Sequence, residues 1–331
     1  MASSVYLPNS GEMVADYGRS IWHDAIVNNS ARPSRKLKIM VFVPCYNEEV
    51  YIGSVVLRSK YYTDDVVVID DGSCDKTAEV AQLAGAHVIR HEVNKGKGAG
   101  IKNAFAYAKK ADADILVLMD GDGQHNPDEI PLLIKPIISG EADIVNGSRF
   151  LVKDSHNVPK YRRFGQGVLN VLTNVVSRHK FTDSQSGFRA FSRNTFDCFS
   201  FMQTGMGIES EMLIEAARAN LQVKEVQINV RYDVSGSTLN PLVHGVSVAG
   251  SIVKTLFQQN YTVTCGFCGV LLLLLGTTGF SFLAIEPYDL SRNLLIGITS
   301  VSMLSIILGI LCVFTLLTTS ARETGQVAGQ R

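Results

Sequence analysis

The sequence predicts an α/β fold: a mostly parallel sheet in the N-terminal part, followed by a C-terminal transmembrane helical hairpin. Three observations lead to this class. Strand and helix patterns alternate over residues 37–145, the strand patterns are apolar along their length, and two long uncharged runs follow residue 260. Strands that are apolar on both faces are typical of a parallel sheet covered by helices on each side. The 331 residues are enough for about two domains.

The strands are expected where short β-rich runs stand between helical patterns. These runs are residues 37–43, 66–69, 87–89, 115–119 and 142–145. The helices are expected at residues 48–59, 75–84, 97–110 and 127–139. The third helical segment gathers its apolar residues on one face, and the fourth begins with Pro127, which is favoured in a first turn. In a sheet of this kind, ligands bind beyond the carboxyl ends of the strands.

Two uncharged runs, residues 263–285 and 294–319, are each long enough to cross the hydrocarbon core of a bilayer. A short polar turn separates them, so both ends of the pair are expected on the same side of the membrane. Two buried helices of a soluble core are the alternative interpretation. Lys254 precedes the first run, and Arg322 and Arg331 follow the second. By the positive-inside rule, the chain is expected to be an integral membrane protein whose N-terminal domain is cytoplasmic.

The remaining segments divide the chain further. Residues 1–36 lack the apolar core of a signal peptide and are expected to form a mobile extension. Residues 242–259 carry apolar side chains at helical spacing, which is typical of an interfacial amphipathic helix or of a helix packed on the preceding domain. The expected boundaries are 1–36 for the extension, 37–235 for the α/β domain, 236–260 for the amphipathic helix, 261–319 for the hairpin and 320–331 for a cytoplasmic tail. The formal net charge is zero, so bulk charge does not indicate nucleic acid as a partner.

The most informative motif is Asp-Gly-Asp-Gly-Gln-His at residues 120–125, directly after an apolar strand. Side chains two apart in an extended segment point the same way, so Asp120, Asp122 and Gln124 can converge on one hard cation. Oxygen ligands of this kind suit Mg²⁺ or Mn²⁺. A simple Asp-Gly turn is the alternative. An EF-hand is a poor fit, because His125 and Pro131 stand where its loop requires Gly and Glu.

Two further polar clusters follow predicted strands. Residues 44–49 read Pro-Cys-Tyr-Asn-Glu-Glu, and residues 70–75 read Asp-Asp-Gly-Ser-Cys-Asp. Three acidic or polar strand ends are hard to explain by solvation alone. The glycine-rich segment 94–100 lacks the spacing of a phosphate loop or of a dinucleotide-binding motif. Its backbone amides, with Lys95 or Lys97, can still face a phosphate, and a solvated helix cap is the alternative.

Together these motifs resemble the family 2 glycosyltransferases, and most closely the polyprenyl-phosphate hexosyltransferases typified by dolichol-phosphate mannose synthase. The matching segments, in the family's order, are residues 43–49, 70–77, 94–98, 120–125, 147–149 (Gly-Ser-Arg) and 186–189 (Ser-Gly-Phe-Arg). The resemblance covers about residues 37–235, and the hairpin matches family members that carry a membrane anchor after the catalytic domain. It implies a GT-A-like domain that binds a nucleotide sugar.

The resemblance also implies which residues form the site. The nucleotide sugar and its diphosphate are assigned to Pro44, Tyr46, Asn47, Glu48, Asp71, Lys97, Asp120 and Gln124. The metal is assigned to Asp120, Asp122 and Gln124. The acceptor is assigned to Arg149, Arg163, Ser186, Arg189, Glu209 and Arg231. Asp122 and Arg149 are the expected catalytic residues.

The implied reaction is an inverting transfer of a hexose from the nucleotide sugar to a polyprenyl (dolichyl) phosphate. A lipid phosphate is already an anion, so no general base is obligatory, and a metal neutralises the departing diphosphate. GDP-mannose, UDP-glucose and UDP-N-acetylglucosamine all stay open as donors, as does a homo-oligomeric state. A processive polysaccharide synthase is disfavoured, because the only tryptophan, Trp22, leaves no Q-x-x-R-W motif. A non-catalytic membrane adaptor that binds nucleotide sugar is disfavoured by the intact acidic motif at residues 120–124.

Overall fold

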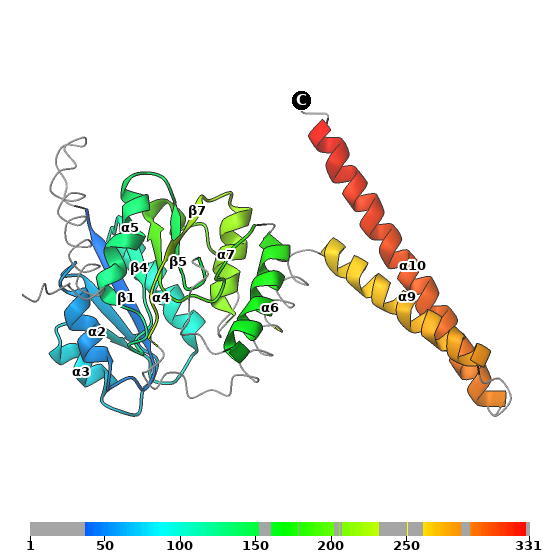
Figure 1. The fold of residues 1–331 in the computed structure, drawn as a ribbon, viewed down its shortest axis with the longest axis horizontal. Coiled ribbons are helices and arrows are strands. Elements are labelled where there is room, and N and C mark those ends of the chain that lie inside the picture. The colour runs from blue at the N-terminus through cyan, green and yellow to red at the C-terminus, as the bar shows by residue number, and fades with distance from the viewer. Residues whose placement is uncertain are drawn as a thin grey trace, which may run out of the picture. The chain divides into compact units, whose positions relative to one another are not determined.

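The computed structural model describes residues 37–151, 160–177, 179–201, 205, 207–231, 250, 261–285 and 292–328. The predictions for residues 1–36 and for most of 236–260 concern segments outside these residues. The chain divides into two compact units, Met1–Ile252 and Val253–Arg331. The first contains the sheet and the second contains a pair of long helices (Figure 1).

Within the described residues, the first unit is built on a seven-stranded sheet in the order β3-β2-β1-β4-β6-β5-β7. Its first half consists of β1 (Ile39–Cys45), β2 (Val66–Asp70), β3 (His87–Arg90) and β4 (Ile115–Leu118). β1 pairs in parallel with both β2 and β4, and β2 pairs in parallel with β3. The carboxyl ends of these four strands therefore lie along one edge. The prediction of a mostly parallel α/β sheet is confirmed.

The second half of the sheet contains two strands that the sequence patterns do not predict. It consists of β5 (Ile144–Ser148), β6 (Arg189–Ser192) and β7 (Val223–Gln227). β6 runs antiparallel between β4 and β5, and β7 pairs in parallel with β5. β6 is only four residues long and begins with an arginine, while β7 contains Lys224 and Glu225. Neither therefore shows the continuous apolar run that predicts a buried strand.

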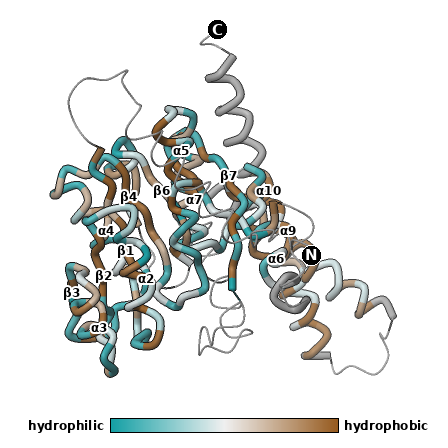
Figure 2. Tube along the Cα trace, turned by 60° about the vertical axis from the view of Figure 1, so that its left-hand side comes forward, coloured by the Kyte–Doolittle hydropathy of each residue, from teal (hydrophilic) through white to brown (hydrophobic). Residues whose placement is uncertain are grey.

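Helices cover both faces of the sheet. Alternate strand residues point to opposite sides, and both sides carry apolar side chains that the helices bury. Ile39 and Val41 of β1 face one apolar core, whereas Met40 and Phe42 face the other. The first core is closed by α2 (Ile52–Ser59), α3 (Thr77–Leu83) and α5 (Ile130–Ile138), and the second by α4 (Lys97–Lys110) and α7 (Ile208–Arg218). The other helices described in this unit are η1 (Pro127–Glu129), α6 (Lys160–Ser177) and η2 (Arg193–Thr195). Figure 2 shows hydrophobic residues along central strands such as β4 and hydrophilic residues in many surrounding loops.

The α-helices α2 and α5 begin later than predicted, because a turn or a 3-10 helix occupies the residues before them. α2 begins at Ile52 rather than at residue 48, because residues 46–51 form the turn that follows β1. Asn47 in this turn has a positive φ of 57°, which a helix cannot contain. The predicted helix 127–139 divides into η1 and α5. The predicted helix 97–110 agrees with α4.

The second unit consists of α9 (Tyr261–Ile285) and α10 (Arg292–Ala328). Both are long and apolar enough to cross a membrane, over Gly266–Leu283 and Leu294–Thr315. Large apolar side chains are exposed along both helices, including Phe267, Leu274, Leu304 and Ile310. A core helix of a soluble protein would bury such residues. The two apolar helices predicted from the sequence are present, and α10 stays helical beyond residue 319, to Ala328.

Candidate functional site

The ends of β1 and β2 are tied together at the carboxyl edge of the sheet. The backbone amide of Asn47 donates to Ser73 Oγ at 2.9 Å, and the amide of Cys74 donates to Asn47 Oδ1 at 2.9 Å. The amide of Glu48 donates to Thr77 Oγ1 at 2.7 Å. The predicted donor residues on this turn are Pro44, Tyr46, Asn47 and Glu48. The turn is therefore held by the loop after β2, which fixes where these residues lie.

Asp71 lies just beyond β2 and contacts the glycine-rich loop 94–98. Its Oδ1 accepts from the backbone amide of Lys95 at 2.9 Å, and its Oδ2 accepts from that of Gly96 at 2.8 Å. His91 Nδ1 lies 2.7 Å from the same Oδ1. The carboxylate is buried and holds the protein's own loop. A direct contact of Asp71 with a base or ribose stays a prediction.

Lys97 joins the acidic motif to the start of α7. Its Nζ lies 2.6 Å from Asp120 Oδ1 and 2.6 Å from Glu209 Oε1. Burial by itself lowers the pKa of Lys97, but the two carboxylates outweigh it and raise that pKa above its ordinary value. Burial likewise opposes ionisation of Asp120, yet Lys97 and His125 hold its pKa below the usual range. This cluster of Lys97, Asp120 and Glu209 therefore contains an ionised Asp120 paired with a lysine cation.

Asp122 and Glu48 add further negative charge beside this pair. Burial, followed by repulsion from Asp120, raises the pKa of Asp122. Burial, followed by repulsion from Asp122 and Asp120, raises the pKa of Glu48 to about 7. Carboxyl groups that raise one another's pKa mark a region with a surplus of negative charge, which a divalent cation would relieve. The residues present therefore fit a metal bound at this motif.

The protein supplies only part of such a metal site. Among the described residues, no three or more His, Cys, Asp or Glu side chains are grouped as a metal centre. Asp122 Oδ1 accepts from the backbone amide of Gln124 at 3.0 Å, which keeps the motif in a tight turn. Mg²⁺ is usually bound by one or two carboxylates together with substrate phosphates, so two aspartates and one amide suit a metal carried by a diphosphate.

Glycines allow close packing around the acidic motif. A Cβ on Gly187 would overlap the carboxylate of Asp120, and a Cβ on Gly121 would lie 2.9 Å from Cys45 Cβ. Gly123 has a φ of 72° and packs on the ring of Tyr51. The loop before β6 thus comes into direct contact with the acidic motif, a contact that the sequence does not predict.

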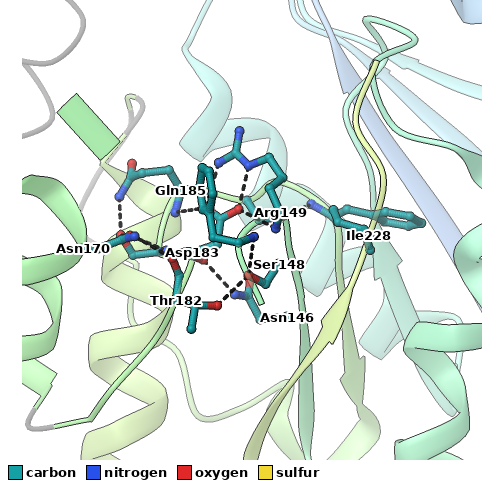
Figure 3. Close-up of polar contacts among 12 residues, drawn as sticks. Asn146, Ser148, Arg149, Asn170, Thr182, Asp183, Gln185 and Ile228 are labelled. Atoms are coloured by element: carbon teal, nitrogen blue, oxygen red, sulfur yellow. Dashed lines mark hydrogen bonds and ion pairs between the residues drawn. The ribbon is translucent and has the colours of Figure 1, made fainter. Parts of the chain in front are cut away.

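Arg149, which follows β5, forms a two-bond ion pair with the buried Asp183 (Figure 3). Its Nε donates to Oδ2 at 2.6 Å and its Nη2 donates to Oδ1 at 2.7 Å. With its amide oxygen turned toward the guanidinium, Gln166 accepts from Nη1 at 3.1 Å and from Nη2 at 3.2 Å. All three guanidinium nitrogens of Arg149 thus have partners within the protein. Its predicted contact with the acceptor stays a prediction.

Asp183 is held in turn by β5 and β7. Asn146 Nδ2 donates to the Asp183 carbonyl at 2.8 Å and to Glu225 Oε1 at 3.0 Å. Glu225 also accepts from the backbone amide of Thr182 at 2.8 Å. Burial opposes ionisation of Asp183, but Arg149 lowers its pKa below the ordinary value. Arg149 is therefore positioned by an ionised carboxylate that is itself fixed to the sheet.

Arg189 lies fully buried at the start of β6. Its Nη1 donates to the Glu209 carbonyl at 2.7 Å, and its Nη2 donates to the Ser184 carbonyl at 3.0 Å. Burial lowers the pKa of this guanidinium to about 10. Ser186 Oγ accepts from the amide of Phe188 at 3.3 Å. In this arrangement Arg189 fixes the first turn of α7 to the loop before β6, and the predicted acceptor roles of Arg189, Ser186 and Glu209 stay predictions.

Residues 228–231 form a segment that lies against the acidic motif. Val230 forms an antiparallel bridge with His125, and the Arg231 amide donates to the Gln124 carbonyl at 2.9 Å. Buried Glu129 accepts from Asn229 Nδ2 at 2.7 Å and from the Asn229 backbone amide. The structure thus brings Arg231, a predicted acceptor residue, beside the predicted metal motif. The side chain of Arg163, on α6, lies outside the described residues.

The sequence patterns miss the residues that hold the predicted ones in place. These are His91, Glu129, Asp183, Glu225 and Asn229. Glu129 follows the proline of a predicted helix and resembles an ordinary acid of a first turn. Asp183 precedes the Ser-Gly-Phe-Arg segment in a polar stretch without periodicity. A charged residue in a polar stretch gives no sign of burial until its partner is known.

Comparison with known proteins identifies the family of this chain. The family model described as glycosyl transferase family 2 matches residues 40–199. A UDP-N-acetylglucosamine–dolichyl-phosphate N-acetylglucosaminyltransferase of Methanococcus voltae is 34% identical over 216 residues, which are 59% of this chain and 86% of that protein. The chain belongs to glycosyl transferase family 2. The family resemblance inferred from the motifs is therefore confirmed.

Two further matches place this family 2 glycosyltransferase among its relatives. An undecaprenyl-phosphate mannosyltransferase of Micrococcus luteus is 28% identical over 203 residues, which are 58% of this chain and 83% of that protein. The crystal structure of glucosyl-3-phosphoglycerate synthase from Mycobacterium tuberculosis with Mn²⁺ and UDP-glucose matches with a TM-score of 0.54 and 25% identity. It covers 70% of this chain and 82% of that one. A protein of this fold thus binds a divalent metal together with a nucleotide sugar.

Proposed function

We propose that this family 2 glycosyltransferase moves one hexose from a nucleotide sugar to a polyprenyl phosphate, with inversion at the anomeric carbon. The observation that carries the proposal is the meeting of Asp120, Asp122, Lys97 and Glu209 at the carboxyl edge of the sheet. It joins a place suited to a cation-bound diphosphate to the first turn of α7, which contains the predicted acceptor residue Glu209. The relatives from M. voltae and M. luteus both have polyprenyl-phosphate acceptors in their names, which supports the acceptor class.

On the donor side, Asp120, Asp122 and Gln124 would hold Mg²⁺ or Mn²⁺, which would neutralise negative charge on the leaving diphosphate. Lys97 supplies a second, permanent cation within ion-pair distance of Asp120. The backbone amides that open α4 add donors suited to a phosphate, since a helix N-terminus favours anions. Residues 44–48 and 70–75 are proposed to hold the nucleoside.

On the acceptor side, Arg149 is proposed to hold the lipid phosphate. Asp183 fixes its guanidinium in one orientation, so little ordering remains to be done when an anion binds. A phosphate anion attacks without prior loss of a proton, so the site needs no general base. The proximity of Arg231 to Gln124 supports a second acceptor contact near the donor phosphates.

A bilayer is the proposed environment, with the first unit on the cytoplasmic side. α9 and α10 are long and apolar enough to span it. On α6, Val168, Val171 and Val175 are 46%, 62% and 69% exposed and recur at helical spacing. An apolar face of this kind on the first unit suits contact with lipid and with a lipid-linked acceptor.

The test is transfer of radiolabelled sugar to polyprenyl phosphate by the full chain in detergent or in nanodiscs. A panel of GDP-mannose, UDP-glucose and UDP-N-acetylglucosamine identifies the donor. Label that extracts into organic solvent supports the proposal. Label retained in polymer would instead indicate a polysaccharide synthase, and binding without turnover on any donor would indicate a non-catalytic adaptor.

A further inference from the structure

We propose that His91 is a positioning residue for the nucleotide sugar, acting through Asp71 to hold residues 94–97 in their donor-facing conformation. The inference rests on the proposed function, because it assumes that a nucleotide sugar binds at the ends of β1, β2 and β4. His91 belongs to none of the motifs recognised in the sequence. It directly follows β3 (His87–Arg90), and only 6% of its surface is exposed.

Both ring nitrogens of His91 have partners on different elements. Nδ1 lies 2.7 Å from Asp71 Oδ1, and Nε2 lies 2.7 Å from Asn103 Nδ2 on α4. The amide nitrogen of Asn103 can only donate, so Nε2 accepts and the ring proton resides on Nδ1. Nδ1 then donates to the Asp71 carboxylate. The contact with Asn103 thus selects the tautomer of the ring that donates to Asp71.

The Asp71 carboxylate connects His91 to the glycine-rich loop. It accepts from the amides of Lys95 and Gly96 in addition to His91. A carboxylate held from only one side can rotate about its last side-chain bond, because that torsion is broad. His91 donates to Oδ1, the oxygen that also accepts from the Lys95 amide, and so adds a restraint from a residue outside segment 94–97. The Lys95 and Gly96 amides therefore depend on His91 for a fixed acceptor.

The loop that receives this constraint leads directly into the proposed donor site. Gly96 precedes α4 with a φ of 87°, and the next residue, Lys97, forms the ion pairs with Asp120 and Glu209. The loop also packs tightly on the turn after β2. A Cβ on Gly72 would lie 2.8 Å from the Val93 carbonyl carbon. A change in the Asp71 carboxylate therefore alters where Lys97 and the α4 amides meet a phosphate.

The alternative interpretation is that His91 only fills space. Two substitutions by amide residues, H91N and H91Q, distinguish this packing role from the proposed positioning role. The nitrogen of an asparagine at residue 91 reaches the place of Nδ1, whereas that of a glutamine reaches nearer to Nε2. H91N can therefore still donate to Asp71, and H91Q cannot without distortion. Both remove the ring and leave a similar gap. If packing alone matters, H91N is at least as damaging as H91Q.

The experiment measures transfer by full-length H91N, H91Q and H91L in nanodiscs, with donor and acceptor varied separately. Loss of a hydrogen bond to a charged group costs about 1.5–3 kcal/mol, so H91Q and H91L are expected to raise donor KM by about tenfold or more. Acceptor KM should change by less than about twofold. H91N should recover most of the donor affinity. Exposed His87, at the start of β3, provides a control in H87Q.

A second measurement needs no turnover. In ¹⁵N-histidine-labelled protein, the His91 signals, assigned by their loss in H91N, should show the tautomer protonated at Nδ1. N103D replaces the donor at Nε2 with an acceptor, so the preference for this tautomer should be lost. An Nε2-protonated ring in the native protein, equal impairment of H91N and H91Q, or equal rises in donor and acceptor KM would each overturn the proposal. Absence of transfer by the native protein on every donor would instead count against the proposed function.

Discussion

The two units of this protein stabilise their interiors in different ways. The first unit buries charged side chains, among them Asp70, Glu129, Asp183 and Arg189, and provides nearly all of them with specific partners. The second brings α9 and α10 together through glycines. A Cβ on Gly269 would lie 2.9 Å from the Gly309 carbonyl, and a Cβ on Gly309 would lie 2.8 Å from the Gly269 carbonyl.

The difference is the one expected if the first unit lies in water and the second in the proposed bilayer. In water, burying apolar surface drives folding, and a buried charge is tolerated only where a partner stands opposite it. Between apolar helices in lipid that driving force is absent, so small residues and close backbone contact hold the helices together. Substitutions in the first unit should therefore act through lost partners, and those in the second through added atoms.

The largest effect is expected at the acidic motif. Asp122→Ala removes an anionic ligand of the proposed metal, and Lewis-acid assistance is worth several kcal/mol, so transfer should fall by about a thousandfold. Exposed Glu141, which pairs with Lys224 at the surface, gives the control Glu141→Ala, with activity retained. Chelation by EDTA should abolish transfer by the native protein, and Mg²⁺ or Mn²⁺ should restore it. Full activity of the variant, or activity that persists in EDTA, would remove the metal assignment.

The next effect concerns the buried ion pair of Arg149. Asp183→Ala leaves a guanidinium without its carboxylate in a buried site, which costs about 3–5 kcal/mol of unfolding free energy. Arg149→Lys keeps the charge but cannot form the two-bond fork, so it should also destabilise the first unit. Urea unfolding of both variants in detergent checks this.

Steady-state kinetics of Arg149→Lys test its proposed second role. If Arg149 also holds the acceptor phosphate, acceptor KM should rise while donor affinity, measured by calorimetry, stays nearly unchanged. A loss of donor affinity instead would place Arg149 at the diphosphate. A stable variant with native kinetics would show that the fork matters for neither role.

Glu129 predicts an unusual dependence of stability on pH. Burial raises its pKa from 4.5 to about 7, although Asn229 partly opposes the shift. Between these two values the folded protein keeps a proton that the unfolded chain has lost, so this group's contribution to stability falls as pH rises from about 4.5 to 7. Glu129→Gln should lack this slope. Compared with the variant, the native protein should gain about 2–3 kcal/mol between pH 8 and pH 5, by the linkage between pKa and stability. Parallel stability curves for the two proteins would contradict the raised pKa.

The smallest effect is expected in the hairpin. A Cβ on Gly276 would lie 2.5 Å from Ile306 Cγ1 and 2.8 Å from the Ser302 carbonyl, so Gly276→Val should push α10 away. Overpacking of this kind costs about 1–3 kcal/mol. Spin-label distances between the helices should lengthen. Gly297→Val is the control, because nothing lies within 4 Å of its Cβ position. Equal behaviour of the two variants would show that glycine contacts do not set the helix spacing.

Much of the fold could be predicted because its signals are local. The apolar runs of β1, β2 and β4, the helix 97–110 and the two uncharged spans each show their own periodicity or length. The polar strand ends could be predicted to meet, because parallel strands present their carboxyl ends at one edge. β6 and β7 escaped prediction because a four-residue strand and a charged strand have no distinctive pattern of their own.

The sequence by itself determined the class of the fold, the position of the acidic motif and the presence of two long apolar helices. Only the tertiary structure decided which charges face one another. Asp183 pairs with Arg149, which lies 34 residues away in the sequence, and Glu129 accepts hydrogen bonds from Asn229, which lies 100 residues away. Such pairs form because burial makes an unpaired charge costly, and the partner that satisfies it is set by the order of strands in the sheet. That order, with β6 inserted between β4 and β5, is a property of the whole chain.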